Sequence, residues 1–373
     1  MKKKTLKKPR SVYYFQLMTD YQTLLYLIKN FQTSDDHAKE LLQKILTDKN
    51  IIHNILCLIF FCKNTNILNF SKELYDLHKD NLLRNLYIIG ELKKISKKCN
   101  EFNIENPVLL KGASYLFKLY NADYGYRILS DIDLLALNQH HKTELIKILK
   151  TIGYGFGSKY QETLTNGIIK IDIHDELLNS NRIEWRKSLF SNITINKHIL
   201  SKCYENQYFN FLTDDIDFIY CLFHSAIHHG FNNIKWSVDA YLFIEMNLVK
   251  PDSIFKTIES LNLINEFRFI LTCFNIDFKL SEDWIKIFNL PYKNKIVSKL
   301  KSAKTNKIKY SQYIFNFLLM KKKERLKYIV FLIFPSKKIL KLKYSENDNI
   351  LNLYLKHLIE IIKSAVRTII SKR

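Results

Sequence analysis

The chain has 373 residues, of which 47% are hydrophobic, and it contains only 8 glycines and 5 prolines. This composition excludes a disordered or collagen-like chain, and the long runs rich in Leu, Ile and Lys favour a mostly helical protein with a large core. The formal net charge of +22 fits an anionic partner, but it fits equally the Lys-rich composition of an AT-rich genome, since the charges are scattered more than clustered.

The first hundred residues predict helices. Leu and Ile recur at three- and four-residue spacing in 13–31 and in 80–99, which is the period of an amphipathic helix. No apolar segment directly follows the basic N-terminus as in a secretory signal, and the longest apolar runs, 51–62 and 328–334, are too short to cross a bilayer. The 6 cysteines form no CxxC pair, which is typical of thiols in a reducing compartment. We therefore expect a cytoplasmic protein with a helical N-terminal region over residues 1–105.

A small module of strands and helices is predicted over residues 106–200, followed by a helical domain over 201–373. The module combines short apolar runs with Gly-containing turns, whereas the text after Thr213 has helical spacing interrupted by prolines. The predicted fold class is thus α+β, a small mixed β-sheet core flanked by N-terminal and C-terminal helical regions. In chain order, the module contains a strand at 107–110, a helix at 113–120, a strand at 131–137, a helix at 140–153, and two paired strands at 155–160 and 167–174 around a turn at 165–167.

Two aspartates one residue apart interrupt an apolar strand of this module. Because side chains alternate between the faces of a strand, Asp131 and Asp133 point the same way, and Asp172 and His174 share a face of a later strand. If the two strands are neighbours, three carboxylates converge, and a divalent cation such as Mg²⁺ would relieve their repulsion. The alternative is an exposed sheet face with ordinary charges, which the apolar neighbours disfavour.

The strand-to-helix turn before these aspartates has features of a phosphate site. Gly112 allows close approach of the backbone to a phosphate, and the N–H groups at the start of the following helix attract anions. Ser114 offers a hydroxyl to a phosphate oxygen.

These features, in this order, resemble the nucleotidyltransferase superfamily of the polymerase-beta type. More narrowly, "LLKG" (109–112), an arginine shortly before "DIDLL" (131–135), "DIH" (172–174) and the helical stretch 223–244 resemble the family described as uncharacterised nucleotidyltransferases, over roughly residues 80–365. One departure is Ala113, which stands where the superfamily has Gly or Ser directly after the glycine, and it bears on the role of Ser114 more than on that of Gly112.

The resemblance implies a metal-dependent enzyme that transfers an NMP from an NTP, with ATP expected, to a hydroxyl-bearing acceptor and releases pyrophosphate. Asp131, Asp133 and Asp172 would be catalytic and would bind Mg²⁺ or Mn²⁺. Arg127 would pair with the triphosphate, or hold a carboxylate as part of the scaffold. The implied nucleotide-binding residues are Lys111, Gly112, Ser114 and Arg127.

A histidine-rich stretch follows on a later predicted helix. His224 and His228 lie one turn apart, a spacing that suits a metal. The resemblance implies that this helix packs on the catalytic module, so that one of these histidines, with Asp239, lines the pocket. His174, on the face of Asp172, is a further candidate for the pocket, either as a hydrogen-bond partner of the site or as a structural residue. Hydrogen-bonded structural histidines explain the same residues equally well.

A second Asp-Ile-Asp pattern, at Asp215 and Asp217, lacks an upstream glycine turn. It opens a predicted helix, where acidic residues favour the positive end of the dipole, so we interpret it as capping.

The acceptor stays open, and a small molecule, a sugar, a peptide or a protein would each fit. Two alternatives remain: an RNA- or tRNA-binding or RNA-modifying protein, and a catalytically inactive nucleotide-binding module. A nucleic-acid acceptor is less favoured because the basic segments lie at the chain ends, away from the carboxylates. The C-terminal basic segments alternate cationic and apolar residues, which fits peripheral membrane contact or packing on the core.

Overall fold

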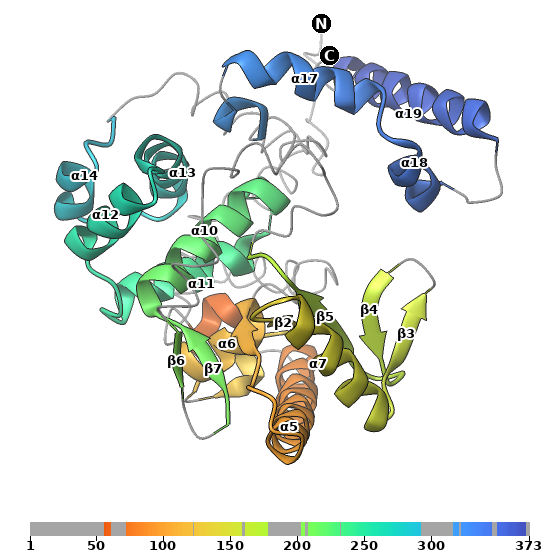
Figure 1. The fold of residues 1–373 in the computed structure, drawn as a ribbon. Coiled ribbons are helices and arrows are strands. Elements are labelled where there is room, and N and C mark those ends of the chain that lie inside the picture. The colour runs from red at the N-terminus through yellow and green to blue at the C-terminus, as the bar shows by residue number, and fades with distance from the viewer. Residues whose placement is uncertain are drawn as a thin grey trace, which may run out of the picture.

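The computed structural model contains a mixed β-sheet layered between helices (Figure 1), which confirms the predicted α+β class. Residues 13–31, predicted as a helix, lie outside the described part of the chain. The structure describes residues 56–60, 72–121, 123–158, 161–177, 203–205, 208–231, 233–291, 316–320, 322–344 and 349–370.

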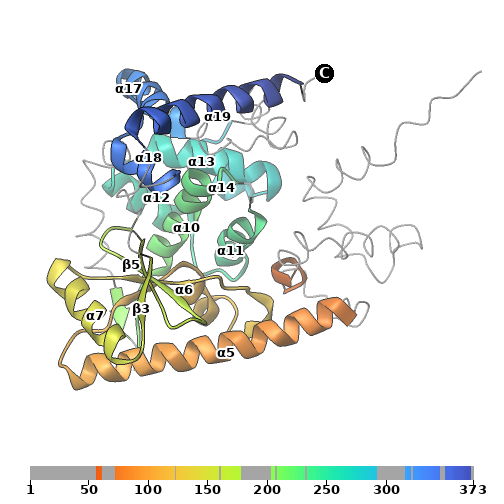
Figure 2. The same ribbon diagram turned by 90° about the vertical axis from the view of Figure 1, so that its right-hand side faces the viewer.

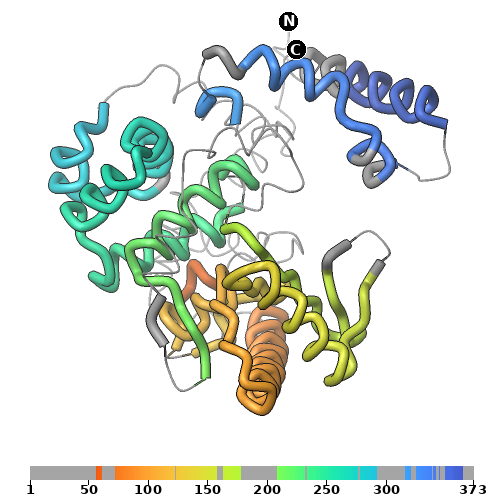
Figure 3. Tube along the Cα trace, in the orientation of Figure 1, coloured from red at the N-terminus to blue at the C-terminus, as the bar shows by residue number. Residues whose placement is uncertain are grey.

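The sheet has seven strands among the described residues, in the order β3-β4-β5-β2-β1-β7-β6. β2 lies at its centre, antiparallel to β1 and parallel to β5, and this register sets Asp133 opposite both Leu110 and Asp172. β7 pairs in parallel with β1. In the Cα trace of Figure 3, the green segment of β7 therefore runs beside the orange segment of β1. The strands are β1 (Val108–Leu110), β2 (Ile132–Leu135), β3 (Gly155–Ser158), β4 (Gln161–Thr165), β5 (Lys170–His174), β6 (Cys203–Glu205) and β7 (Asn210–Leu212).

The predicted direct pairing of 155–160 with 167–174 is wrong. β4 lies between β3 and β5 and pairs antiparallel with both. The sequence of β4 has Leu164 as its one apolar residue, so it lacks the alternation that marks a strand. The turn at 165–167 does form, with Gly167 at a φ of +89°, but it joins β4 to β5.

Helices make up most of the remaining described chain, and the prediction of helices after Thr213 is confirmed. Among the described helices, none is both long enough and apolar enough to cross a membrane. The helices are α5 (Lys72–Glu101), α6 (Lys111–Lys118), a 3₁₀ turn η2 (Tyr124–Tyr126), α7 (Gln139–Thr151), α10 (Asp214–His229), α11 (Ile234–Glu245), α12 (Pro251–Ser260), α13 (Ile264–Asp277), α14 (Glu282–Ile287), α17 (Lys322–Ile333), α18 (Lys337–Lys343) and α19 (Ile350–Ile370).

The two faces of the sheet pack against different helices. Alternate residues of the central strands, including Ile132 and Ile171, share a core cluster with residues of α5 and α7. The opposite face, including Leu135, packs against Ile216 and Tyr220 of α10. Figure 2 shows the layering, with α5 along one side of the sheet and α10 and α11 on the other. Since residues 131, 133 and 172 alternate with the first set, the aspartates belong to the α10 face.

The predicted domain boundaries at residues 105 and 200 stay a prediction. α5, from the N-terminal segment, shares a core with the sheet, and β7, from beyond residue 200, is one of its strands.

Candidate active site

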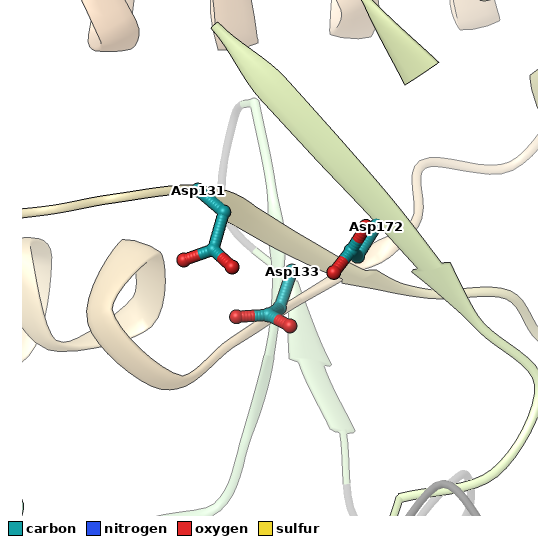
Figure 4. A group of neighbouring side chains, drawn as sticks. All are labelled: Asp131, Asp133 and Asp172. Atoms are coloured by element: carbon teal, nitrogen blue, oxygen red, sulfur yellow. The ribbon is translucent and has the colours of Figure 1, made fainter. Parts of the chain in front are cut away.

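The structure brings Asp131, Asp133 and Asp172 together on the α10 face of the sheet. One carboxylate oxygen of each lies within 4.8 Å of the other two. Figure 4 shows the first two side chains descending from the start of β2 and the third turned toward them from β5. Asp133 is buried, whereas the other two are partly exposed, so the cluster has a buried floor and an accessible side.

Asp133 is the most strongly held of the three carboxylates. Its Oδ1 accepts hydrogen bonds from Lys111 Nζ and from His174 Nε2, both at 2.6 Å. Burial alone would raise the pKa of Asp133, but the Lys111 charge and the His174 hydrogen bond outweigh it and hold this pKa well below its usual range. Asp133 is therefore ionised at neutral pH.

Lys111 has an unusual backbone as well as a short contact. It is the first residue of α6, directly after β1, and its φ of +51° lies in the left-handed region, which is unfavourable for a residue with a Cβ. The N-cap residue Leu110 makes no side-chain hydrogen bond to the helix, so the first N–H groups of α6 have no side-chain cap. An uncapped helix start beside the aspartates can attract an anion.

Gly112 has a packing role in the structure. A Cβ placed on it would lie 2.4 Å from Cδ2 of Leu129 and 3.6 Å from Nη2 of Arg127. Its lack of a side chain allows α6 to lie close to the segment that leads into β2.

The hydroxyl of Ser114 is engaged by a buried carboxylate of α10. Ser114 Oγ donates a 2.8 Å hydrogen bond to Asp217, and Lys118 Nζ lies 3.0 Å from the same carboxylate. The predicted helix start is confirmed, since α10 begins at Asp214, but the interpretation of Asp217 as a capping residue is incomplete. Asp217 is fully buried and ties α10 to α6.

Arg127 and Asp239, two predicted site residues, bind each other. Arg127 donates from Nε to both carboxylate oxygens at 3.0 Å and from Nη2 to Oδ2 at 2.7 Å, and Tyr120 Oη donates to Oδ1 at 2.8 Å. Burial alone would lower the pKa of Arg127, but the carboxylate of Asp239 outweighs this effect and raises the pKa above its usual value, so the guanidinium keeps its charge. This buried pair connects α11 to the segment before Asp131.

The histidines of α10 form an aromatic cluster. The rings of His224 and His228 stack 4.6 Å apart, and His224 Nε2 lies 3.2 Å from His229 Nε2. Burial lowers the pKa of His224 well below 6.5, and the positive charge of Lys111 lowers it further. His224 is therefore neutral, and it lies within electrostatic range of the aspartate site. Among the described residues, only the aspartate trio has the ligand spacing of a metal site.

Two residues near the trio were not predicted from the sequence. Thr163 Oγ1 donates a hydrogen bond to Asp172. It was missed because β4 was missed. Lys235, in the first turn of α11, interacts electrostatically with Asp131, and burial followed by the charge of Arg127 lowers its pKa to about 8. No local pattern marks Lys235, because only the tertiary fold brings α11 to the start of β2.

The donor set fits a hard divalent cation. Three carboxylates supply oxygen ligands, as Mg²⁺ and Mn²⁺ prefer, and leave room for water and phosphate oxygens on the accessible side. An α+β sheet with such a trio beside a strand-to-helix turn is an arrangement that can hold a divalent cation next to a phosphate group.

Comparison with known families identifies the group to which the chain belongs. The model of a family described as uncharacterised nucleotidyltransferase matches residues 39–278, more than half of the chain. The chain belongs to this family and is a nucleotidyltransferase. The match begins before the stretch expected from the resemblance and ends just after α13, so α14, α17, α18 and α19 lie outside it. No curated protein and no solved structure matches the chain.

Proposed function

We propose that the protein transfers an NMP from an NTP, with ATP as the expected donor, to a hydroxyl group of a small molecule, sugar, peptide or protein, with release of pyrophosphate. The observation that carries this proposal is the convergence of Asp131, Asp133 and Asp172 within 4.8 Å of one another in a chain of this family. A cluster of ionised carboxylates is unfavourable unless cations offset their mutual repulsion, and nucleoside triphosphates bind together with such cations.

The three aspartates hold Mg²⁺ or Mn²⁺. When bound there, the cation supplies positive charge that offsets the charge on the triphosphate and on the attacking oxygen. His174 fixes the orientation of Asp133 through the 2.6 Å hydrogen bond.

The triphosphate is received by cations at two helix starts and by the backbone donors of one of them, α6. Lys111 and the uncapped N–H groups of α6 lie beside Asp133 on one side. Lys235, at the start of α11, contributes positive charge near Asp131 on the other. Gly112 acts through close packing beside Leu129, Ser114 through its hydrogen bond to Asp217, and Arg127 through its ion pair with Asp239.

The transfer step exchanges one P–O bond for another. The acceptor oxygen forms a bond to the α-phosphorus, the bond from that phosphorus to the bridging oxygen of the β-phosphate breaks, and pyrophosphate leaves. Asp172, partly exposed on β5, takes the proton of the acceptor hydroxyl. Positioning and charge neutralisation provide most of the rate enhancement in such transfers.

A binding experiment tests the site without knowledge of the acceptor. Mn²⁺ binding is measured by electron paramagnetic resonance with and without an ATP analogue that resists cleavage between the α- and β-phosphates. Asp131→Asn should lose most of the Mn²⁺ binding. Asp215→Asn, from the similar Asp-Ile-Asp pattern on α10, is the matched control and should bind as the wild type does. Equal Mn²⁺ affinity in the wild type and Asp131→Asn would contradict the assignment.

A labelling experiment tests the reaction. The protein is incubated with cell lysate and NTP that carries ³²P at either the α- or the γ-phosphate. Label should pass to an acceptor from the α-position only, and Asp131→Asn should abolish it. Transfer from the γ-position would instead show a kinase-type reaction.

A further inference from the structure

One oxygen of Asp133 already has two donors. Lys111 Nζ and His174 Nε2 both lie 2.6 Å from Oδ1. A carboxylate oxygen has about two lone-pair directions, so Oδ1 has none left for a metal ion. The side chains of Lys111 and Asp133 are 12% and 7% exposed, so bulk water weakens their ion pair little.

The two donors differ in their freedom to leave. His174 is a buried ring on β5, and its position follows that of the strand. Lys111 reaches Asp133 through a flexible four-carbon chain, and it starts the helix whose N-terminus faces the proposed triphosphate position. Its backbone has the left-handed conformation, which carries an energetic cost, while its ammonium group contacts Asp133.

The ammonium group of Lys111 and a bound metal ion would therefore compete for the carboxylate of Asp133. We propose that Lys111 is a built-in counter-ion of the metal site, which holds Asp133 until a metal ion displaces it and then moves from the carboxylate to the triphosphate of the bound nucleotide. This inference rests on the proposed function, since it concerns the same site. Its consequence is that Lys111 opposes metal binding in the absence of nucleotide and favours it in the presence of nucleotide.

The test compares Mn²⁺ affinity in the nucleotide-free protein. Lys111→Met should bind Mn²⁺ about tenfold more tightly than the wild type or better, because the competing charge is removed from a poorly solvated oxygen. Lys111→Arg keeps the charge and should show no such gain. Lys170→Met removes an exposed charge from the same strand as Asp172, without a described contact to the trio, and should change the affinity by less than about twofold.

The ATP analogue provides the second half of this comparison. It should raise the Mn²⁺ affinity of the wild type by a larger factor than that of Lys111→Met. In the wild type the triphosphate also draws the opposing ammonium group away from Asp133, and this coupling is lost in the variant. A Lys111→Met protein that binds Mn²⁺ no more tightly than the wild type would overturn the inference. If the wild type itself binds no Mn²⁺ with or without the analogue, the proposed function fails and this inference fails with it.

Chemical labelling of the wild type gives a measurement that needs no variant. Acetylation of Lys111, read by peptide mass spectrometry, should be slow in the nucleotide-free protein, faster with Mn²⁺ alone, and slow again with Mn²⁺ and the ATP analogue. Unchanged acetylation on addition of saturating Mn²⁺ would show that the ammonium does not leave Asp133 and would overturn the inference.

Discussion

Replacement of Arg127 by Met tests whether this residue acts as scaffold. Arg127 is 1% exposed and its partner Asp239 is fully buried. Met preserves much of the side-chain volume but removes the three hydrogen bonds that the guanidinium donates to the carboxylate. Asp239 then keeps only the hydrogen bond from Tyr120 among those the structure shows.

The expected loss follows from the burial of the remaining charge. Removal of one partner from a buried ion pair costs about 3–5 kcal/mol. Burial raises the pKa of Asp239, and Arg127 opposes that rise. Without Arg127 the folded protein retains a proton on Asp239 that the unfolded chain releases above about pH 4. The stability of the variant therefore falls by about 1.4 kcal/mol per pH unit above that pH, and up to about 2.7 kcal/mol of the loss should disappear between pH 7 and pH 5.

Urea unfolding, followed by circular dichroism at pH 5 and pH 7, measures both effects. The double variant Arg127→Met/Asp239→Asn has no buried carboxylate at this position, so its stability relative to the wild type should depend much less on pH. If Arg127→Met unfolds within about 1 kcal/mol of the wild type at pH 7, the pair does not stabilise the fold as described. If it is stable but binds the ATP analogue much more weakly, Arg127 contacts the nucleotide instead.

Three further predictions concern single residues. Gly112→Ala should lower the unfolding free energy by about 1–3 kcal/mol in thermal melts, because the new methyl group meets Leu129, whereas Gly90→Ala, in the open middle of α5, should raise it by about 0.5–1 kcal/mol. Burial keeps His224 neutral in the folded protein, whereas in the unfolded chain this histidine gains a proton as the pH falls below about 6.5. Wild-type stability should therefore decrease by up to about 1.4 kcal/mol per pH unit below that pH, and His224→Phe should lack this contribution. Lys235, with a pKa of about 8, loses its charge above that pH. The affinity for the ATP analogue, measured by calorimetry from pH 7 to pH 9.5, should therefore fall in the wild type and stay constant in Lys235→Arg.

The carboxylate trio could be predicted because it depends on a local rule. Side chains alternate along every strand, so Asp131 and Asp133 share a face in any sheet, and only the pairing of β2 with β5 had to be assumed to add Asp172. The strand-to-helix junction was equally visible from the glycine after a short apolar strand, but α6 begins at Lys111 and not at the predicted residue 113.

The partners of these residues could not be predicted, because they depend on contacts between distant segments. Ser114 and Asp217 are separated by 103 positions in the sequence, and Arg127 and Asp239 by 112. A serine after a glycine turn has the same local sequence whether its hydroxyl meets a phosphate or a buried carboxylate. β4 was missed for a related reason, since a strand with one apolar residue is recognised only through its neighbours.

The buried ion pairs explain how helices far along the chain become part of the site. Asp217 of α10 pairs with Lys118 of α6, and Asp239 of α11 pairs with Arg127 before β2. A misplaced helix would leave a buried charge unpaired, and that penalty is larger than any gain from a surface contact. The pairs thus favour this placement of α10 and α11 on the sheet, and the placement of α11 brings Lys235 within electrostatic range of Asp131. The positive groups proposed to receive the triphosphate therefore depend on charges that contact no substrate.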